Sequence, residues 1–469
     1  MNNKRSVLVV GAGIAGLTCA CKLAEEGMGV VLVEKEEKVG GLARTFKYGK
    51  YRYDIGPHRF YSSKEDVLDF LHSVMKDDLL EIVRFSAVHY CDRYHTWPLR
   101  LKSVFQLPLR ISVPAFMDLF TKSKYQKLTE PSFKNYILGK YGNTLYETFF
   151  KGYTEKFLGL SPEEVHFHWA KIGVERATID KKIKTGSISQ LFYLMMMPKP
   201  KQLNFLYPPG GIDVFCSRMR DRIIGMGGKV ITGKSPGKIE HDGQNITSVQ
   251  IGDEIYMPDM VIWTAPITTL FEHMNLEPTG LKYLSLIIYN LEIKEPPLQN
   301  YQWCYFGSKD VIFSRATNPA QFDRNMIPKN NGSLCVEVTC MEDSETWQHP
   351  EKLNDEVIEG LVRAGSISSR DVVKNIHIER IPDTYPIYDI DYLDKLSVVR
   401  SKLRKFHNLF LAGRTGLFWY NNMDHSIENA FGVVEKVLGH TPETAHKRLE
   451  DPFHLGAAVG DPSCVMAKV

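Results

Sequence analysis

The sequence predicts an α/β fold, and three features of its first forty residues predict it. Residues 7–10 form a continuous apolar run, which is typical of a strand buried on both faces of a parallel sheet. A G-x-G-x-x-G pattern follows directly, at Gly11, Gly13 and Gly16. Small and apolar residues then recur at helical spacing, so this stretch is predicted to be a strand, a tight turn and a helix.

The spacing of the three glycines matches a dinucleotide-binding turn. The first glycine permits the tight turn, the second lets the backbone approach a pyrophosphate, and the third lets the helix pack against the strand. The helix N-terminus adds free amides and the positive end of the helix dipole. Glycine-rich turns also occur in ordinary α/β proteins, but here the strand before and the helix after favour dinucleotide binding.

An acidic residue ends the next predicted strand and narrows the choice of dinucleotide. Glu34 follows the apolar residues 30–33, where a carboxylate would accept hydrogen bonds from an adenosine ribose. A carboxylate there disfavours a 2′-phosphate, so FAD or NAD is expected rather than NADP. The pair Gly40-Gly41 comes six residues later, with Arg44 just beyond it. A second glycine pair after the ribose acid is typical of FAD-binding chains, so FAD is favoured.

The composition is that of a soluble globular enzyme of two or three domains. The chain has 469 residues, 43% hydrophobic and 24% charged, and its net charge of +3 is too small to suggest nucleic acid as a partner. The eight cysteines form no C-x-x-C pair and no metal-ligand spacing, so no metal is expected. No signal peptide or apolar run of transmembrane length occurs, and a reducing cytoplasm is therefore the expected location.

Further along the chain, the pattern changes twice and then returns to the first domain. Residues 96–204 are predicted to form a helical insertion, with a helix starting at residues 161–164 (SPEE). The apolar run at residues 191–197 is expected to be buried between helices, in preference to lining a pocket or touching a membrane. Residues 276–384 are strand-rich and are expected to form an antiparallel substrate domain.

The predicted architecture therefore has a discontinuous Rossmann-like FAD-binding domain, with two other domains inserted into it. Its parts are residues 1–95, 205–275 and 385–445, because the apolar strand near residue 410 and the following amphipathic helix complete the sheet. The N-terminus of that last helix, near residues 422–426, is a second place where backbone amides would stabilise an anion, such as a reduced flavin's ring nitrogen.

Motifs spread over most of the chain resemble those of the UDP-galactopyranose mutases and of their protoporphyrinogen-oxidase-like and amine-oxidase-like flavoprotein relatives. They are GPH at 56–58, LYETFFKGYTEK at 145–156, YPPGGI at 207–212, FSR at 313–315, YPI at 385–387 and GRTGLFWYNNMD at 413–424. The C-terminal motif and the KGYT stretch are typical of the whole superfamily. The GPH motif followed by aromatic residues favours the mutase branch.

The resemblance implies a role for particular residues. FAD would be held by Gly11, Gly13, Ala15, Gly16, Glu34, Lys35, Gly40, Gly41, Leu42 and Arg44 at its adenosine end, and by Gly56, Pro57, His58, Gly413, Arg414, Asn422, Met423, Asp424 and Ser426 at its flavin end. His58 would lie beside the isoalloxazine ring. The catalytic set would be His58, Arg315, Tyr385 and Tyr420, with Arg315 and the two tyrosines gripping the substrate diphosphate.

Three departures from the mutase motifs leave the sugar, and the reaction itself, open. Leu158 stands where the mutases have a tryptophan, and Asn422 stands where they have an aspartate. A second diphosphate arginine has no clear counterpart, and Arg176 is only one candidate.

Two functions follow from the resemblance. The first is a nucleotide-sugar mutase that interconverts pyranose and furanose rings through a reduced-flavin sugar adduct. The alternative is an FAD-dependent oxidoreductase acting on an apolar substrate such as an amine, a porphyrinogen or a polyene. In both cases the partner is a small molecule, and homodimerisation stays open.

Overall fold

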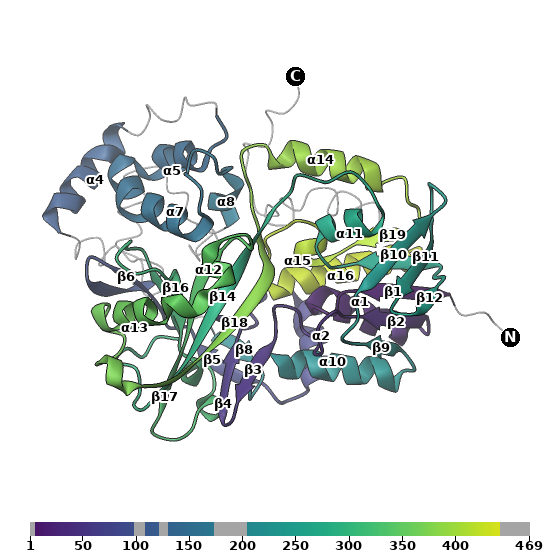
Figure 1. The fold of residues 1–469 in the computed structure, drawn as a ribbon, viewed down its shortest axis with the longest axis horizontal. Helices are drawn as coiled ribbons and strands as arrows, with labels where there is room; N and C mark the ends of the chain where they lie inside the picture. The colour runs from purple at the N-terminus through teal and green to yellow at the C-terminus, as the bar shows by residue number, and fades with distance from the viewer. Residues whose placement is uncertain (1–4, 98–107, 122–129, 173–203, 441–469) are drawn as a thin grey trace.

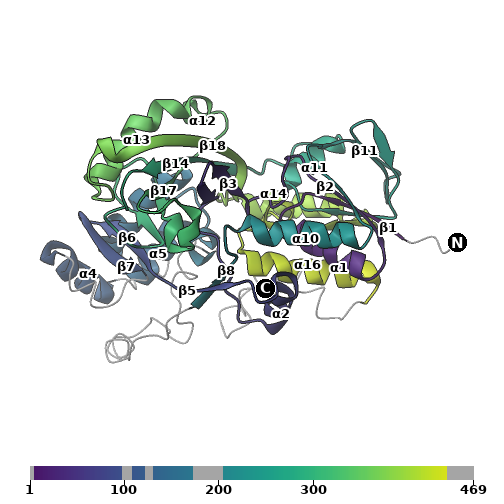
Figure 2. The ribbon, with the colours of Figure 1, turned by 90° about the horizontal axis from the view of Figure 1, so that it is seen from below.

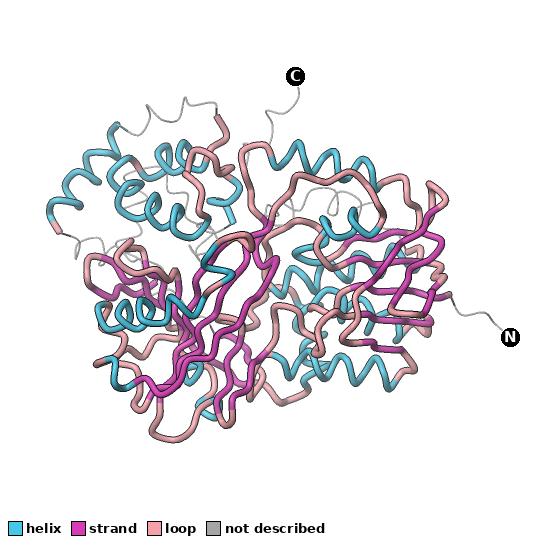
Figure 3. The backbone as a smooth tube through the Cα atoms, viewed as in Figure 1, coloured by secondary structure: helices cyan, strands magenta, loops and turns pink. Residues whose placement is uncertain are grey.

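The computed structural model describes residues 5–97, 108–121, 130–172 and 204–440. Two features singled out in the sequence lie outside the described residues, namely Arg176 and the apolar run at 191–197. Most of the described strands belong to two large sheets, which lie in opposite halves of the molecule (Figures 1 and 3).

The first sheet has five strands, all parallel, in the order β19, β13, β1, β2 and β9. These strands come from three separated stretches of chain: β1 (Ser6–Val10), β2 (Gly29–Val33), β9 (Lys229–Ile231), β13 (Met260–Trp263) and β19 (Leu409–Leu411). The predicted Rossmann-like sheet, assembled from distant parts of the sequence, is therefore confirmed.

The side chains of β1 alternate between two hydrophobic cores. Val7 and Val9 pack with a layer of helices, whereas Leu8 and Val10 pack with an antiparallel meander and a short helix. All four are at most 3% exposed, which explains why the run contains no polar residue. Figure 2 shows the helix layer on one side of the sheet. The helices are α1 (Ile14–Glu25), α2 (Glu65–Met75), α10 (Asp213–Gly225) and α16 (Met423–Leu438); the other side holds β10 (Pro236–His241), β11 (Ile246–Ile251), β12 (Glu254–Tyr256) and α11 (Ile267–His273).

The second sheet has seven strands in the order β18, β14, β17, β16, β15, β6 and β7. All neighbours are antiparallel except β15 and β6, which are parallel. Apolar side chains of one face pack against α13, so this half has a core of its own. The bounds are β6 (Ser86–Tyr90), β7 (Arg93–Trp97), β14 (Tyr283–Ile293), β15 (Trp303–Phe306), β16 (Arg315–Thr317), β17 (Gly332–Cys340), β18 (Val373–Pro386), α12 (Glu345–Gln348) and α13 (Asn354–Arg363).

The antiparallel sheet predicted for residues 276–384 is present, but it also takes two strands from outside that range. β6 and β7 fall largely within residues 1–95, yet β6 pairs with β15, as in Trp303 opposite Ser86. These two residues are more than two hundred positions apart in the chain, so local sequence patterns cannot predict that β6 pairs with β15. β18 likewise runs two residues past the expected boundary at 384.

Helices predominate in the described part of residues 96–204, and they stand beside the seven-stranded sheet (Figure 1). The predicted helix start at residues 161–164 is wrong, because these residues form a turn. His166 next pairs with Ser132 in an isolated bridge, which holds the chain extended. The helices are α4 (Leu109–Thr121), α5 (Phe133–Tyr141), α6 (Asn143–Leu145), α7 (Gly152–Leu158) and α8 (His168–Ala170), with a π-helical segment at Tyr146–Lys151.

The remaining elements join the two halves. A hairpin packs on the face of the second sheet that α13 leaves uncovered, and another short pair of strands leads into the YPPGGI turn. These elements are β3 (Thr45–Tyr48), β4 (Tyr51–Asp54), β5 (Leu80–Val83), β8 (Asn204–Tyr207), α14 (Tyr392–Leu403), α15 (Gly413–Gly416) and the 3₁₀ turns Pro319–Gln321, Arg324–Met326, Pro350–Leu353 and Arg370–Val372. Within the described ranges, no helix combines the length and the apolar character that crossing a membrane requires.

The last lysine of the KGYTEK stretch connects the helical region to the second sheet. Lys156 Nζ donates hydrogen bonds to three backbone carbonyls, those of Phe306 (2.7 Å), Ser308 (2.7 Å) and Val311 (3.2 Å). Burial lowers the pKa of Lys156 to about 7. Lys156 therefore clamps the loop between β15 and β16, and its role in the motif is structural.

Replacing Lys156 by methionine should lower the free energy of unfolding by about 2–4 kcal/mol, because three carbonyls lose a charged donor. Lys151→Met is the matched control, since Lys151 is exposed and only pairs with Glu147 on its own helical segment. Urea unfolding at pH 6 would measure both variants. Equal effects of the two substitutions would contradict the clamp.

Candidate functional site

In the glycine-rich turn between β1 and α1, the first and third glycines pack tightly against neighbouring atoms, whereas the second faces open space. Gly11 has φ +96°, and a Cβ there would lie 2.5 Å from Thr264 Oγ1. A Cβ on Gly16 would lie 1.9 Å from the carbonyl oxygen of Gly11. A Cβ on Gly13, in contrast, would meet nothing within 4 Å. The first turn of α1 has no capping side chain and no acidic residue, so its amides remain available to an anion.

Glu34 and the second glycine pair lie directly against this turn. The buried carboxylate of Glu34 accepts hydrogen bonds from the backbone N–H groups of Ala12 (2.7 Å) and Glu36 (3.0 Å). A Cβ on Gly41 would lie 3.1 Å from the Cα of Gly13. Arg44 holds this loop by donating to the carbonyl oxygen of Gly41 at 2.8 Å. The residues predicted to hold the adenosine end are therefore brought together, with Leu42 partly buried and Lys35 exposed beside them.

The C-terminal motif closes on the same helix from the other end of the chain. A Cβ on Gly413 would lie 3.0 Å from the Cβ of Ala15, and the Gly413 amide donates to Asn429 Oδ1 at 3.0 Å. The helix α16 begins at Met423, as expected, and Ser426 Oγ in its first turn donates to Asn421 Oδ1 at 3.2 Å.

The GPH corner packs against the FSR motif of the second sheet. Arg315 and Glu337 lie opposite each other on β16 and β17, and Nε of the arginine donates to Oε1 of the glutamate at 2.6 Å. Burial, the largest single influence, acts to lower the pKa of Arg315, but Glu337 together with Tyr385 and Tyr305 raises that pKa overall. Gly56 has φ +74°, and a Cβ there would lie 2.8 Å from Glu337 Oε1. Glycine is thus required where the corner meets the ion pair.

Two tyrosines and a second arginine extend this group. Arg315 Nη2 donates to Tyr385 OH at 3.3 Å, and the rings of Tyr385 and Tyr420 meet edge to face with centroids 5.2 Å apart. The guanidinium of Arg414 lies over Tyr420 at 5.0 Å and over Tyr385 at 5.7 Å. Its nitrogens also donate to the carbonyl oxygens of Thr384 and Asn421. The YPI, FSR and GR motifs therefore meet at one place.

His58 lies close enough to these arginines for their positive charges to affect its pKa. Burial, followed by the charges of Arg414, Arg315 and Arg59, lowers the pKa of His58 to about 3. Its Nδ1 is buried and has no hydrogen-bond partner among the residues that the structure describes. The imidazole is therefore neutral at physiological pH, with one ring nitrogen left for a ligand atom.

Comparisons with known proteins identify chains of the same fold. A family model described as an NAD(P)-binding Rossmann-like domain matches residues 9–74. The crystal structure of reduced UDP-galactopyranose mutase superposes with a TM-score of 0.81 at 20% sequence identity, covering 97% of this chain and 98% of that one. This chain has the fold of UDP-galactopyranose mutase. A structure from Exiguobacterium sp. 255-15, titled as a protoporphyrinogen oxidase, gives a TM-score of 0.72 at 16% identity, covering 93% and 99%.

Sequence relatives that are named as mutases match shorter stretches of this chain. The UDP-galactopyranose mutase of Klebsiella pneumoniae is 28% identical over 172 residues, which are 35% of this chain and 44% of the relative. The dTDP-fucopyranose mutase of Escherichia coli is 29% identical over 164 residues, or 34% and 43% of the two chains. The chain thus spans less than half the length of these curated relatives. The resemblance to mutases inferred from the motifs is confirmed.

One departure from the mutase motifs has a structural counterpart. Leu158, which stands in place of the tryptophan, is buried in the core at 2% exposure. It therefore presents no side chain to a ligand. The indole of Trp169 stacks on Tyr420 instead, with centroids 5.2 Å apart and an interplanar angle of 18°. Asn422 is exposed and makes no capping hydrogen bond at the start of α16.

Sequence reasoning missed several residues of this group. They are Arg59, Arg84, Tyr153, Trp169, Trp303 and Tyr305. Arg59 was the easiest to find, because it directly follows GPH. The others come from strands and helices that meet the site only through tertiary packing.

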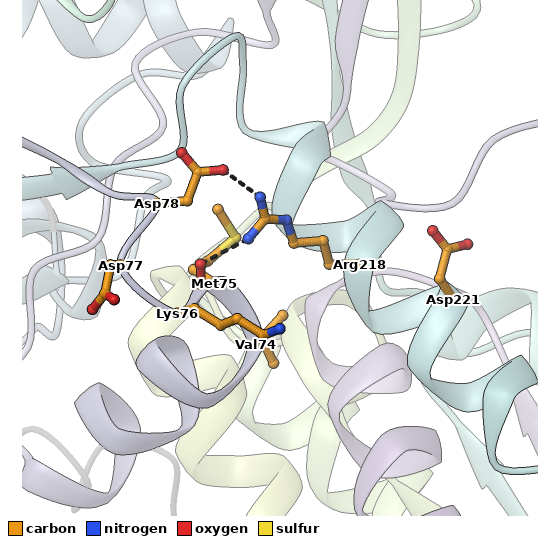
Figure 4. A pocket seen from close by; sticks show the side chains of 7 residues that line it. All are labelled: Val74, Met75, Lys76, Asp77, Asp78, Arg218 and Asp221. Carbon is orange, nitrogen blue, oxygen red and sulfur yellow. Dashed lines mark hydrogen bonds and ion pairs between the residues drawn. The ribbon is translucent and has the colours of Figure 1, made fainter.

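The surface also has an open hollow of about 690 Å³ between the end of α2 and α10 (Figure 4). Its lining is polar at the mouth, where Arg218 pairs with Asp78 and donates to the carbonyl oxygen of Met75. None of the residues assigned above to the cofactor or to catalysis lines this hollow.

Gly56→Ala should destabilise the protein by about 2–4 kcal/mol, since it combines a positive φ with a clash against the Arg315–Glu337 pair. Gly49→Ala is the control, because Gly49 also has a positive φ (+56°) but open space where its Cβ would lie. It should cost only about 1 kcal/mol. Chemical unfolding measures both, and equal losses would contradict the close packing of the GPH corner.

His58 should make the protein more sensitive to acid. Its pKa in the folded state, about 3, lies below the ordinary value of 6.5, so the unfolded state binds more protons between these values. The stability gained from a neutral His58 is therefore full above about pH 6.5 and is lost as the pH falls. His58→Gln should lose less free energy of unfolding than the parent between pH 7 and pH 4. Parallel curves of stability against pH for the two proteins would refute this.

Proposed function

We propose that this chain is an FAD-dependent enzyme that interconverts the pyranose and furanose forms of a nucleotide sugar. The observation that carries the proposal is the convergence of Arg315, Tyr385, Tyr420 and Arg414 beside His58 in a chain with the fold of UDP-galactopyranose mutase. A diphosphate leaving group needs fixed cationic and hydroxyl donors, and arginine supplies a planar fork that matches its oxygens.

The residues present fit FAD at both ends. The open side of Gly13, the uncapped first turn of α1 and the buried carboxylate of Glu34 suit an adenosine diphosphate. The buried Nδ1 of His58, which has no partner within the described part of the chain, and the uncapped start of α16 suit a flavin ring. Reduced FAD, when bound, supplies a nucleophilic nitrogen for the anomeric carbon.

We assign the cofactor and substrate roles residue by residue, as the family resemblance implies. The adenosine end falls to Gly11, Gly13, Ala15, Gly16, Glu34, Lys35, Gly41, Leu42 and Arg44, and the flavin end to Gly56, Pro57, His58, Gly413, Arg414, Asn422, Met423, Asp424 and Ser426. Arg315, Tyr385 and Tyr420 face the substrate, next to His58.

The protein contributes orientation and a fixed electrostatic field. Arg315 uses Nε and Nη2 on Glu337 and Tyr385, which leaves Nη1 to donate to a phosphate oxygen. Its guanidinium is held rigidly by these bonds, so little reorganisation is needed when a diphosphate arrives. The neutral His58 accepts or donates a hydrogen bond without adding charge to the cationic site.

The finer assignments of domain, location and assembly are also proposals. We divide the chain into the FAD-binding, helical and sheet domains expected from the sequence, with residues 86–97 moved to the sheet domain because of the pairing of β6. The seven cysteines of the described part are all free thiols, which supports a reducing compartment such as the cytoplasm. A homodimer would be tested by light scattering.

The mutase proposal predicts that activity depends on the redox state of the flavin. The FAD-loaded protein should be inert when oxidised, and dithionite reduction should allow ring interconversion of a nucleotide sugar. The oxidoreductase alternative predicts the opposite, namely bleaching of the flavin absorbance by substrate without added reductant. Chromatography of UDP- and dTDP-sugars, together with flavin spectra, separates the two. Absence of interconversion across the whole panel of reduced reactions would refute the mutase proposal.

Arg315→Ala should weaken nucleotide-diphosphate binding by about 2–5 kcal/mol while FAD content stays normal. The single variant strands Glu337 as a buried carboxylate, so the double variant Arg315→Ala/Glu337→Gln should be measured beside it. Both should bind UDP weakly by calorimetry. Arg324→Ala, an exposed arginine outside the site, should bind UDP as the parent does. The oxidoreductase alternative predicts no effect in any of them.

A further inference from the structure

Two arginines outside the assigned catalytic set lie against the same aromatic ring, that of Trp303. The guanidinium carbon of Arg59 lies 4.5 Å from the ring centroid of Trp303, and that of Arg84 lies 5.6 Å from it. Arg59 also lies 5.2 Å from the ring of Phe205. Trp303 is 1% exposed, so the aromatic platform is rigid, while both arginines are half-buried.

Neither arginine has an ion-pair partner among the residues that the structure describes, although the charge of Asp424 acts on Arg59. Each makes one hydrogen bond to an uncharged group, Arg59 to the carbonyl oxygen of Pro57 at 2.7 Å and Arg84 to Ser86 Oγ at 3.2 Å. Across the described ranges, no carboxylate oxygen lies within 4 Å of either guanidinium. Most of the five N–H donors of each side chain therefore remain free.

Arg59 and Arg84 differ from Arg315 in their electrostatic surroundings. Glu337 compensates the charge of Arg315 and raises its pKa. Burial, followed by the charge of Arg59, lowers the pKa of Arg84 to about 10, and burial likewise lowers the pKa of Arg59. Two half-buried cations that lack an ion-pair partner in the described part of the chain repel each other, and an oxyanion that contacts both would relieve this repulsion.

The pair belongs to the proposed substrate site. Arg59 follows His58 directly in the chain, and its charge helps to lower the pKa of His58. The pKa of Arg59 is in turn influenced by Arg315 and Asp424. The pairing of β15 with β6 brings Trp303 opposite Ser86, two residues after Arg84. The arrangement therefore adds a second cationic wall beside the Arg315–Glu337 pair.

We propose that Arg59 and Arg84, which both contact the ring of Trp303, form an oxyanion subsite that binds a phosphate or carboxylate group of the substrate. This inference rests on the proposed function for the identity of the substrate, but the subsite itself requires only an oxyanion. The group is either the nucleotide diphosphate, which Arg315 contacts from the other wall, or a carboxylate carried by the sugar.

The test compares binding by the FAD-loaded protein, the double variant Arg59→Gln/Arg84→Gln and the control Arg380→Gln. Arg380 is an exposed arginine of β18 whose donors also go to backbone carbonyls. The probes are inorganic pyrophosphate, UDP, UDP-glucose and UDP-glucuronate, measured by calorimetry at two salt concentrations. A third variant, Arg59→Lys/Arg84→Lys, keeps the charge without the planar fork and should retain part of the affinity. Flavin content and thermal melting establish that each variant is folded.

We expect the Gln double variant to lose about 10- to 100-fold in affinity, together with the salt dependence of binding. Equal losses for all four probes identify the diphosphate as the ligand. Loss of a preference for UDP-glucuronate over UDP-glucose identifies a sugar carboxylate. If every probe binds the Gln double variant as it binds Arg380→Gln, the subsite is refuted. If the parent binds pyrophosphate through this pair but binds and converts no nucleotide sugar, the proposed function fails and the subsite stands.

Discussion

The buried ion pair between Arg315 and Glu337 is the constraint on which the proposed active site depends. It lies across β16 and β17, it requires a glycine at position 56, and it sets the direction in which Arg315 points toward Tyr385. A buried pair of this kind adds little net stability, since desolvation offsets most of the attraction. Its consequence here is geometric, because it fixes one guanidinium while the pair as a whole carries no net charge. Among the described residues, Arg59, Arg84 and Arg414 donate hydrogen bonds to uncharged groups instead of forming such a pair.

The two sheets contribute different kinds of groups to the proposed site. The parallel sheet collects its strands at the glycine-rich turn, where backbone amides and Glu34 converge. The antiparallel sheet presents side chains, because alternate residues of a strand point to the same face and a cross-strand neighbour is always within reach. The GPH corner and the C-terminal motif lie where the halves meet, which is why Gly56 and Gly413 both pack tightly against residues far away in sequence.

Much of the fold could be predicted from local patterns, and the errors have identifiable causes. Apolar runs predict the strands of the parallel sheet, and an acidic residue or a glycine follows two of these runs, at Glu34 and Gly413. The expected helix at residues 161–164 is absent because its SPEE pattern is only a local preference, and isolated bridges from Val165 to Asp389 and from His166 to Ser132 outweigh it. The place of β6 could not be predicted, since its partner β15 lies more than two hundred residues further along the chain.

By itself, the sequence determined the dinucleotide turn, the discontinuous α/β architecture and the mutase-like motifs, because each depends on the spacing of residues close together in the chain. Only the tertiary structure decided which cations are free and which are compensated. Arg315 carries the recognised motif and forms an ion pair with Glu337, whereas Arg59 and Arg84 lie against Trp303 with no ion-pair partner in the described ranges. Charge compensation depends on distances between side chains from different elements, and these distances exist only once the two sheets have packed together.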